Sequence, residues 1–319
     1  MIAALSLLAG ALAAGWLLPR RLAALDASRR DPVLLIVCWL LSMLGVAMAA
    51  TAGVVLLLIP THGSFGPLLA AVNSCWNALQ HGSPPAAEEL GGALGSIVLA
   101  ALACRLVVVG ARGIRRRART RREHLAALRL AGRADGTAPT TLWLAHDTPL
   151  AFSMSGRRAV IVATDGLRRH LGDDAVAAVL LHEQAHLSGR HHQLIALADA
   201  LRAALPFVPL FRQAPDALRQ LVEVAADVVA IRECGPGAVR EALLGVSGCG
   251  APAGALAMAR DAVAVRLARL DEGGSLPSSG LRRFVNCGAA GITAAAFPFL
   301  TGAVLTVSVA LVACPLGMG

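Results

Sequence analysis

The sequence predicts an α-helical membrane protein with four transmembrane helices and one inserted α+β domain. The chain of 319 residues is 56% hydrophobic and only 15% charged, whereas soluble domains carry about 25% charged residues. Four apolar runs approach the length of about 20 helical residues that crosses the hydrocarbon layer. A more polar stretch of ordinary domain size separates the third run from the fourth.

The apolar runs divide the chain into three parts. The predicted spans cover approximately residues 2–18, 33–59, 90–110 and 288–313. We therefore expect a membrane domain at 1–111, a cytoplasmic domain at 112–285, and the fourth span with a short outer tail at 286–319. The first run is interpreted as a retained span because Arg20 and Arg21 follow its apolar core, whereas a signal peptide carries its positive charge before that core.

Arginine residues occur on alternate sides of the four spans. They cluster after the first span, after the third and before the fourth: Arg20, Arg21, Arg29 and Arg30, then Arg112 to Arg122, then Arg282 and Arg283. The segment 60–89, between the second and third spans, contains no Lys or Arg. By the positive-inside rule we expect both termini outside and the inserted domain in the cytoplasm, in a multi-pass protein of the plasma membrane.

The net charge of +9 does not indicate nucleic-acid binding. The densest arginine cluster, Arg112 to Arg122, directly follows a predicted span and contains no aromatic residue. Anionic lipid headgroups account for such a cluster, at about 1 kcal/mol per arginine near the surface. We expect the lipid bilayer as its partner and no direct contact with nucleic acid.

The seven cysteines form neither a C-x-x-C pair nor a zinc-finger spacing. Cys75 and Cys314 both lie on the predicted outer side of the membrane, where disulfides persist. A Cys75–Cys314 disulfide is therefore a hypothesis.

The most informative stretch is His182-Glu183-Gln184-Ala185-His186, an H-E-x-x-H pattern. Residues four apart share one face of a helix, so both histidines can bind one metal ion. Glu183 can then act on a metal-bound water as general base. The flanking apolar pattern predicts a helix that begins near Asp173. We expect one Zn²⁺ ion per chain.

A catalytic zinc site needs a third protein ligand and leaves one position open for water. Glu223 is one candidate, in an E-x-x-A-D pattern that places Asp227 one helical turn further on. Asp227 could accept a hydrogen bond from a ligand imidazole. His192 is the alternative, because it completes the H-E-x-x-H-x-x-G-x-x-H pattern of metzincins. Against His192, the helix is expected to continue through His191 without a break, and no residue suits a Met-turn.

The inserted domain is expected to mix helices and strands. An arginine-rich helix runs to about Leu130, followed by a loop at Ala131–Thr140 and strands at Leu142–Ala145, Leu150–Met154 and Ala159–Ala163. Further helices are expected from Pro215 through Glu223 to about Arg232, at Val239–Leu244 and at Ala255–Leu270. A flexible linker at Gly273–Gly280 returns the chain to the membrane.

The order of spans, the H-E-x-x-H helix and the E-x-x-A-D pattern resemble the BlaR/MecR-type integral-membrane zinc metallopeptidases, in particular small actinobacterial members. The active-site motifs are also similar to those of Ste24/HtpX-like gluzincins. The resemblance implies a zincin-like fold for the inserted domain. It implies His182, His186 and Glu223 as zinc ligands, Glu183 as base and Asp227 as the residue that orients an imidazole.

The resemblance also implies that Phe152, Ser153, Met154 and Ser155 form an edge strand that pairs with an extended substrate. Antibiotic sensors of this family carry a penicillin-binding domain after the last span. Here only Pro315 to Gly319 follow Cys314, so β-lactam sensing by this chain is not expected.

We therefore expect a membrane-embedded zinc endopeptidase that cleaves a protein or peptide at the cytoplasmic side, in regulated proteolysis or signal transduction. By family analogy its substrate is a repressor or another membrane protein. Arg260 or Arg266 is expected to stabilise the oxyanion, and the sequence does not choose between them. The alternative is a non-catalytic membrane signal transducer with a structural or relic zinc site. A homo-oligomer is compatible with the sequence.

Overall fold

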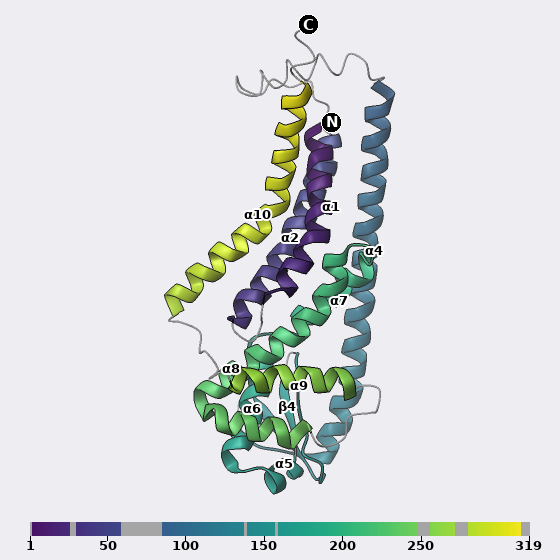
Figure 1. The fold of residues 1–319 in the computed structure, drawn as a ribbon. Helices are drawn as coiled ribbons and strands as arrows, with labels where there is room; N and C mark the ends of the chain where they lie inside the picture. Colours follow the sequence, from purple (N-terminus) through teal and green to yellow (C-terminus); the bar gives the residue numbers. More distant parts are fainter. Residues whose placement is uncertain are drawn as a thin grey trace.

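The computed structural model describes residues 2–25, 30–58, 85–136, 139–156, 159–247, 256–271 and 280–313. Long helices form the upper part of Figure 1, and a smaller part with helices and strands lies below them. The helices are α1 (Ile2–Ala23), α2 (Pro32–Leu58), α4 (Pro85–Ala131), α5 (Asp165–His170), α6 (Asp173–Ser188), α7 (His191–Ala204), α8 (Pro209–Ser247), α9 (Leu256–Asp271) and α10 (Gly280–Ala313). The strands are β1 (Gly132–Ala134), β2 (Thr140–Leu144), β3 (Ala151–Met154) and β4 (Val160–Thr164).

Helices α1, α2 and α10 form a bundle in which each helix contacts the other two (Figure 1). Among the described residues, two helical stretches are long and apolar enough to cross a membrane: Pro32–Leu56 in α2 and Gly288–Ser308 in α10. The other two expected spans fall on α1 and α4, and their crossing of a membrane stays a prediction. Cys75, Cys314 and the expected linker up to residue 279 lie outside the described residues.

Helix α4 connects the bundle to the sheet (Figure 1). Its predicted continuation to about Leu130 is confirmed, since the helix ends at Ala131. It contacts α2 in the bundle and α7 below it, where Arg117 forms an ion pair of 2.9 Å with Asp199. The expected domain boundary at 111/112 therefore lies inside one unbroken helix.

The four strands form one mixed sheet in the order β1-β2-β4-β3. Strands β2 and β4 are parallel, and the outer strands β1 and β3 pair antiparallel with them. The three predicted strands are confirmed, but the expected loop at Ala131–Thr140 is partly wrong because it contains β1. The carboxylate of Asp135 closes the β1–β2 turn by accepting hydrogen bonds from Thr141 N at 2.9 Å and Trp143 Nε1 at 3.2 Å.

Helix α6 begins at Asp173, as predicted, and ends at Ser188. The expectation of a continuous helix through His191 is wrong. Gly189 and Arg190 form a turn, in which Arg190 has a left-handed φ of 51°, and α7 begins at His191. The left-handed residue ends the helical path, so α7 leaves α6 in a new direction.

Helix α8 is longer than the sequence predicted. It begins at Pro209, ahead of Pro215, and it includes the expected separate helix at 239–244 after a kink at Gly235, where φ is 81°. Packing explains the early start, because Leu210 and Phe211 are buried in an apolar cluster that stabilises this turn despite the internal proline.

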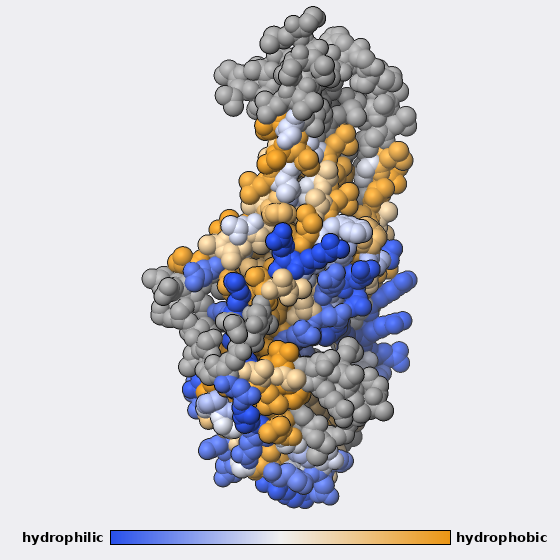
Figure 2. Space-filling view, viewed as in Figure 1, coloured by the Kyte–Doolittle hydropathy of each residue, from blue (hydrophilic) through white to orange (hydrophobic). Residues whose placement is uncertain are grey.

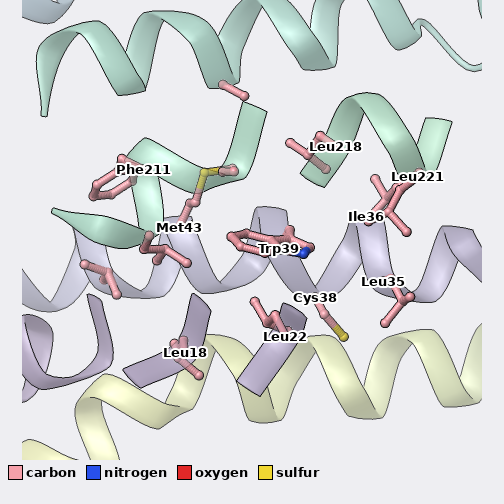
Figure 3. Packing of buried hydrophobic residues seen from close by; sticks show 14 of the residues in the cluster. Leu18, Leu22, Leu35, Ile36, Cys38, Trp39, Met43, Phe211, Leu218 and Leu221 are labelled. Atoms are coloured by element: carbon pink, nitrogen blue, oxygen red, sulfur yellow. The ribbon is translucent and has the colours of Figure 1, made fainter. Parts of the chain in front are cut away.

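Two of the three apolar clusters among the described residues join different parts of the molecule. One joins α6 and α8 to β4 and contains Val176, Val179 and Ala230. The other joins α8 to α1 and α2, where Phe211 lies beside Met43 and Leu221 beside Ile36 (Figure 3). Figure 2 shows apolar residues over the upper helices and mostly hydrophilic residues lower down. The second cluster thus ties the lower part of the molecule to the apolar bundle.

The start of α5 has no room for a side chain. A Cβ on Gly166 would overlap the backbone oxygen of Asp147 and lie 2.7 Å from the carbonyl carbon of Thr148. Because these are backbone atoms, we expect Gly166→Ala to lower the free energy of unfolding by about 1–3 kcal/mol. Thermal unfolding of the detergent-solubilised protein measures this loss. The matched control is Gly237→Ala, where a Cβ meets nothing within 4 Å; equal melting temperatures for the two variants would contradict the prediction.

Candidate metal centre

Two imidazoles and one carboxylate converge where α6 packs against α8. His182 and His186 come from α6 and Glu223 from α8, and their ligand atoms all lie within 4.8 Å of one another. The carboxylate oxygens of Glu223 lie 3.3 Å from His182 Nε2 and 3.4 Å from His186 Nε2. The two Nε2 atoms are 3.1 Å apart. Two nitrogens and one oxygen that face a common point match a catalytic zinc site, which uses three protein ligands and leaves one position open.

A buried carboxylate orients His182. Asp227 is 4% exposed, and its Oδ1 accepts a hydrogen bond of 2.9 Å from His182 Nδ1. Arg266 on α9 donates to the same carboxylate through Nε at 2.6 Å and NH2 at 2.7 Å. Burial opposes ionisation of Asp227, but the hydrogen bonds with His182 and Arg266 hold its pKa below the ordinary value. The His182 imidazole therefore presents Nε2 toward Glu223 and His186.

A third histidine orients His186. His191 is buried, and its Nδ1 lies 3.0 Å from Nδ1 of His186. A neutral imidazole that binds metal through Nε2 carries its proton on Nδ1, so His186 would donate to His191. This role of His191 was not predicted from the sequence. The turn at Gly189 and Arg190 was the available signal, because it allows α7 to place His191 against α6.

The pKa values of the titratable groups in the centre shift in different directions. Burial lowers the pKa of His182, but hydrogen bonds to Asp227 and Glu223 outweigh it and raise that pKa to about 9. Burial lowers the pKa of His186 to about 4, and it also lowers the pKa of His191. Burial opposes ionisation of Glu223, yet its contacts with His182 lower its pKa to about 2. At neutral pH the centre therefore combines an anionic Glu223 with a cationic His182 and a neutral His186.

Glu183 and Arg266 border one cavity of about 210 Å³ beside the ligand group. The rest of its wall includes the ligands His182 and Glu223 and small apolar side chains. Arg266 NH1 lies 3.5 Å from Glu223 Oε2. Of the two arginines that the sequence left open, the structure brings Arg266 to the cavity. The side chain of Arg260 lies outside the described residues.

The remaining predicted site residues lie on β3 and α7. Phe152, Ser153 and Met154 belong to β3, an outer strand of the sheet that contacts α6, and Ser155 directly follows it. His192 Nε2 lies 3.2 Å from Ser153 Oγ. His192 thus contacts the edge strand and lies outside the group of three ligand atoms. This arrangement favours Glu223 over His192 as the third ligand.

We expect His191→Ala to weaken zinc binding about 10-fold or more, because His186 loses the acceptor that orients it. Competition with a chromophoric chelator measures the dissociation constant. His191→Gln retains an acceptor and should recover part of the affinity. The matched control is the neighbouring His192→Ala, which should leave zinc affinity unchanged. Wild-type affinity in His191→Ala, or a large loss in His192→Ala, would contradict this assignment.

Zinc binding should release a proton at neutral pH. Since the pKa of His182 is about 9, a metal must displace its proton, and affinity should rise about tenfold per pH unit between pH 6 and 8. Zinc affinity should rise with pH because the raised pKa keeps the His182 imidazole protonated over this whole interval. Dissociation constants measured across that interval test the slope. In Asp227→Asn the pKa of His182 falls, so the slope should flatten above pH 7; a flat wild-type profile would refute the prediction.

Comparison with known proteins gives one match. Neither a curated protein nor a solved structure matches the chain significantly. The model of peptidase family M48 matches residues 115–231, a range that contains the end of α4, the sheet, α6, α7 and α8 through Glu223 and Asp227. The match does not confirm either the BlaR/MecR-type or the Ste24/HtpX-like subtype. It supports the M48 metallopeptidase family for the part of this chain that carries the metal centre.

Proposed function

We propose that this protein is a membrane-embedded zinc endopeptidase that cleaves a protein substrate at the cytoplasmic side. The convergence of His182, His186 and Glu223 beside Glu183 is the observation that carries the proposal. The match to peptidase family M48 supports the metallopeptidase activity. The apolar stretches in α2 and α10 support a membrane location. The placement of the arginines along the sequence supports the cytoplasmic side.

The residues of the centre have complementary roles in peptide hydrolysis. Zinc held by the two histidines and Glu223 would supply a Lewis acid that lowers the pKa of water to about 7. Glu183 accepts a proton from the attacking water and returns it to the leaving amine. Asp227 and His191 hold the two imidazoles in place. Arg266, at the edge of the cavity, is the candidate partner for the substrate's carbonyl oxygen as it gains negative charge.

The substrate would bind as an extended peptide along β3. An outer strand offers backbone donors and acceptors to an added strand, and the contact of β3 with α6 would bring that peptide close to Glu183. We infer that the chain is a small member of the BlaR/MecR-type peptidases, with motifs shared with the Ste24/HtpX-like gluzincins. A repressor or another membrane protein is the proposed substrate, in regulated proteolysis or signal transduction.

A non-catalytic signal transducer with a structural zinc site is the second candidate. Structural sites close all four metal positions with protein ligands, commonly cysteines. Among the described residues the ligand group contains two histidines and one glutamate. An open fourth position beside a carboxylate favours the enzyme.

Glu183→Gln should abolish peptidase activity while zinc binding is retained, because the amide cannot accept the proton. A loss of about 100-fold or more is expected for a general base. Vesicles that contain the wild type or the variant are incubated with the cell's membrane and cytosolic proteins, and new amino termini are identified by mass spectrometry. Zinc content is measured on the same samples.

The matched control is Glu233→Gln, which changes an exposed carboxylate on α8. It should cleave as the wild type does. Zinc-loaded wild type that produces no new termini would support the transducer. Clear cleavage that survives in Glu183→Gln would instead remove Glu183 as the base.

A further inference from the structure

The connection between α7 and α8 reaches well into the apolar bundle. The term α7–α8 tip denotes residues 197–212, the end of α7 and the start of α8. Val208 from this tip packs on α1 at Gly15, where an added Cβ would lie 2.8 Å from the valine methyl group. Phe211 lies beside Met43 of α2 (Figure 3). The tip therefore lies against the two helices rather than beneath them.

The position of Met43 along α2 indicates how deep the tip reaches into the bundle. Met43 lies eleven residues after Pro32, the start of the apolar stretch, which corresponds to about 16 Å along a helix. The hydrocarbon layer of a bilayer is about 30 Å thick. If α2 crosses that layer, Phe211 lies at roughly half of its depth.

Two large apolar side chains are exposed on the tip, in addition to the exposed Arg202 and Arg212. Phe207 is 61% exposed and Leu197 is 49% exposed. Large exposed apolar side chains on one protruding element are typical of contact with lipid or another apolar partner. Trp16 and Leu17, which follow the contacted Gly15 on α1, are also exposed, at 57% and 49%. The tip therefore continues an apolar surface of the bundle, and this continuity favours acyl chains.

Two charged residues of the tip, Asp199 and Arg202, form ion pairs within the protein. Asp199 accepts from Arg117 at 2.9 Å and from Arg219 at 2.6 Å. Asp216 accepts from Arg202 at 3.1 Å and from Arg219 at 3.0 Å. A bilayer makes such pairing necessary, since no water is present to solvate the charges.

A backbone carbonyl at the end of α7 also has a charged donor. Arg105 NH2 on α4 donates to Ala203 O at 2.9 Å. Helix ends leave carbonyls without a partner inside the helix, and within lipid each must be satisfied by the protein. Arg212 is exposed at the start of α8, and within a bilayer its charge would require local thinning of the lipid or water drawn to the side chain.

We infer that the α7–α8 tip is immersed in the cytoplasmic leaflet, with Phe207 and Leu197 against lipid acyl chains. This inference rests on the membrane location in the proposed function. The immersion of the tip also determines how deep the metal centre lies. Leu221 lies beside Ile36, near the start of α2 (Figure 3), and Glu223 follows two residues later. The centre therefore lies at the membrane surface, and the substrate's cleaved segment must lie close to the bilayer.

Depth-dependent fluorescence quenching tests the immersion. Full-length Phe207→Trp is reconstituted in phosphatidylcholine and phosphatidylglycerol vesicles whose acyl chains carry bromine. The tryptophan at position 207 adds fluorescence to that of the wild type. Brominated lipid should quench most of this added emission, and aqueous iodide should not quench it. The matched control is Leu244→Trp, which adds a tryptophan at a site on α8 that is 54% exposed, beyond the kink at Gly235. Aqueous iodide should quench the emission that this tryptophan adds.

Three results would overturn the inference. Iodide quenching at position 207 would place the tip in water, and protection from both quenchers would mean that protein covers it. Failure of the wild type to float with vesicles would remove the membrane location itself. Peptidase activity is not part of the readout, so bromine quenching at 207 stands even if no cleavage is found. Equal zinc content in both variants and the wild type verifies that they are folded.

Discussion

The packing of α6 against α8 is the constraint on which the rest of the structure depends. His182 and His186 lie on one helix, and Glu223 and Asp227 lie on the other. The imidazoles of α6 and the carboxylates of α8 can meet only when the two helix backbones approach closely. Buried alanines permit that approach, among them Ala178 on α6 and Ala226 and Ala230 on α8. A larger side chain at such a position would separate both imidazoles from the carboxylate together.

The burial of Asp227 couples the centre to a third helix. An unpaired buried carboxylate is costly, so it needs partners in fixed positions. His182 supplies one and Arg266 on α9 supplies the other, through two hydrogen bonds. One turn further along α9, Arg269 NH1 donates to the backbone oxygen of Arg30 at 3.0 Å, between α1 and α2. The same helix thus contacts the metal centre and the connection between two bundle helices.

Helix α8 connects the apolar bundle to the metal centre. Its first turns pack on α1 and α2, and its middle carries Glu223 and Asp227. No flexible joint separates these regions, because the kink lies further on, at Gly235. One helix thus contacts the bundle and carries two residues of the metal centre.

The sequence by itself determined the parts of the site that depend on helical periodicity. His182, Glu183 and His186 are spaced to share a region of one helix, and Glu223 and Asp227 share a face of another, so each set could be predicted locally. Only the tertiary structure decided that the two sets meet, that Arg266 reaches them, and that His191 turns back onto His186. The start of α8 before Pro215 and the pairing of β1 with β2 were also decided there. These features depend on contacts between residues far apart in the chain, and their free energy is not contained in the propensity of any short segment.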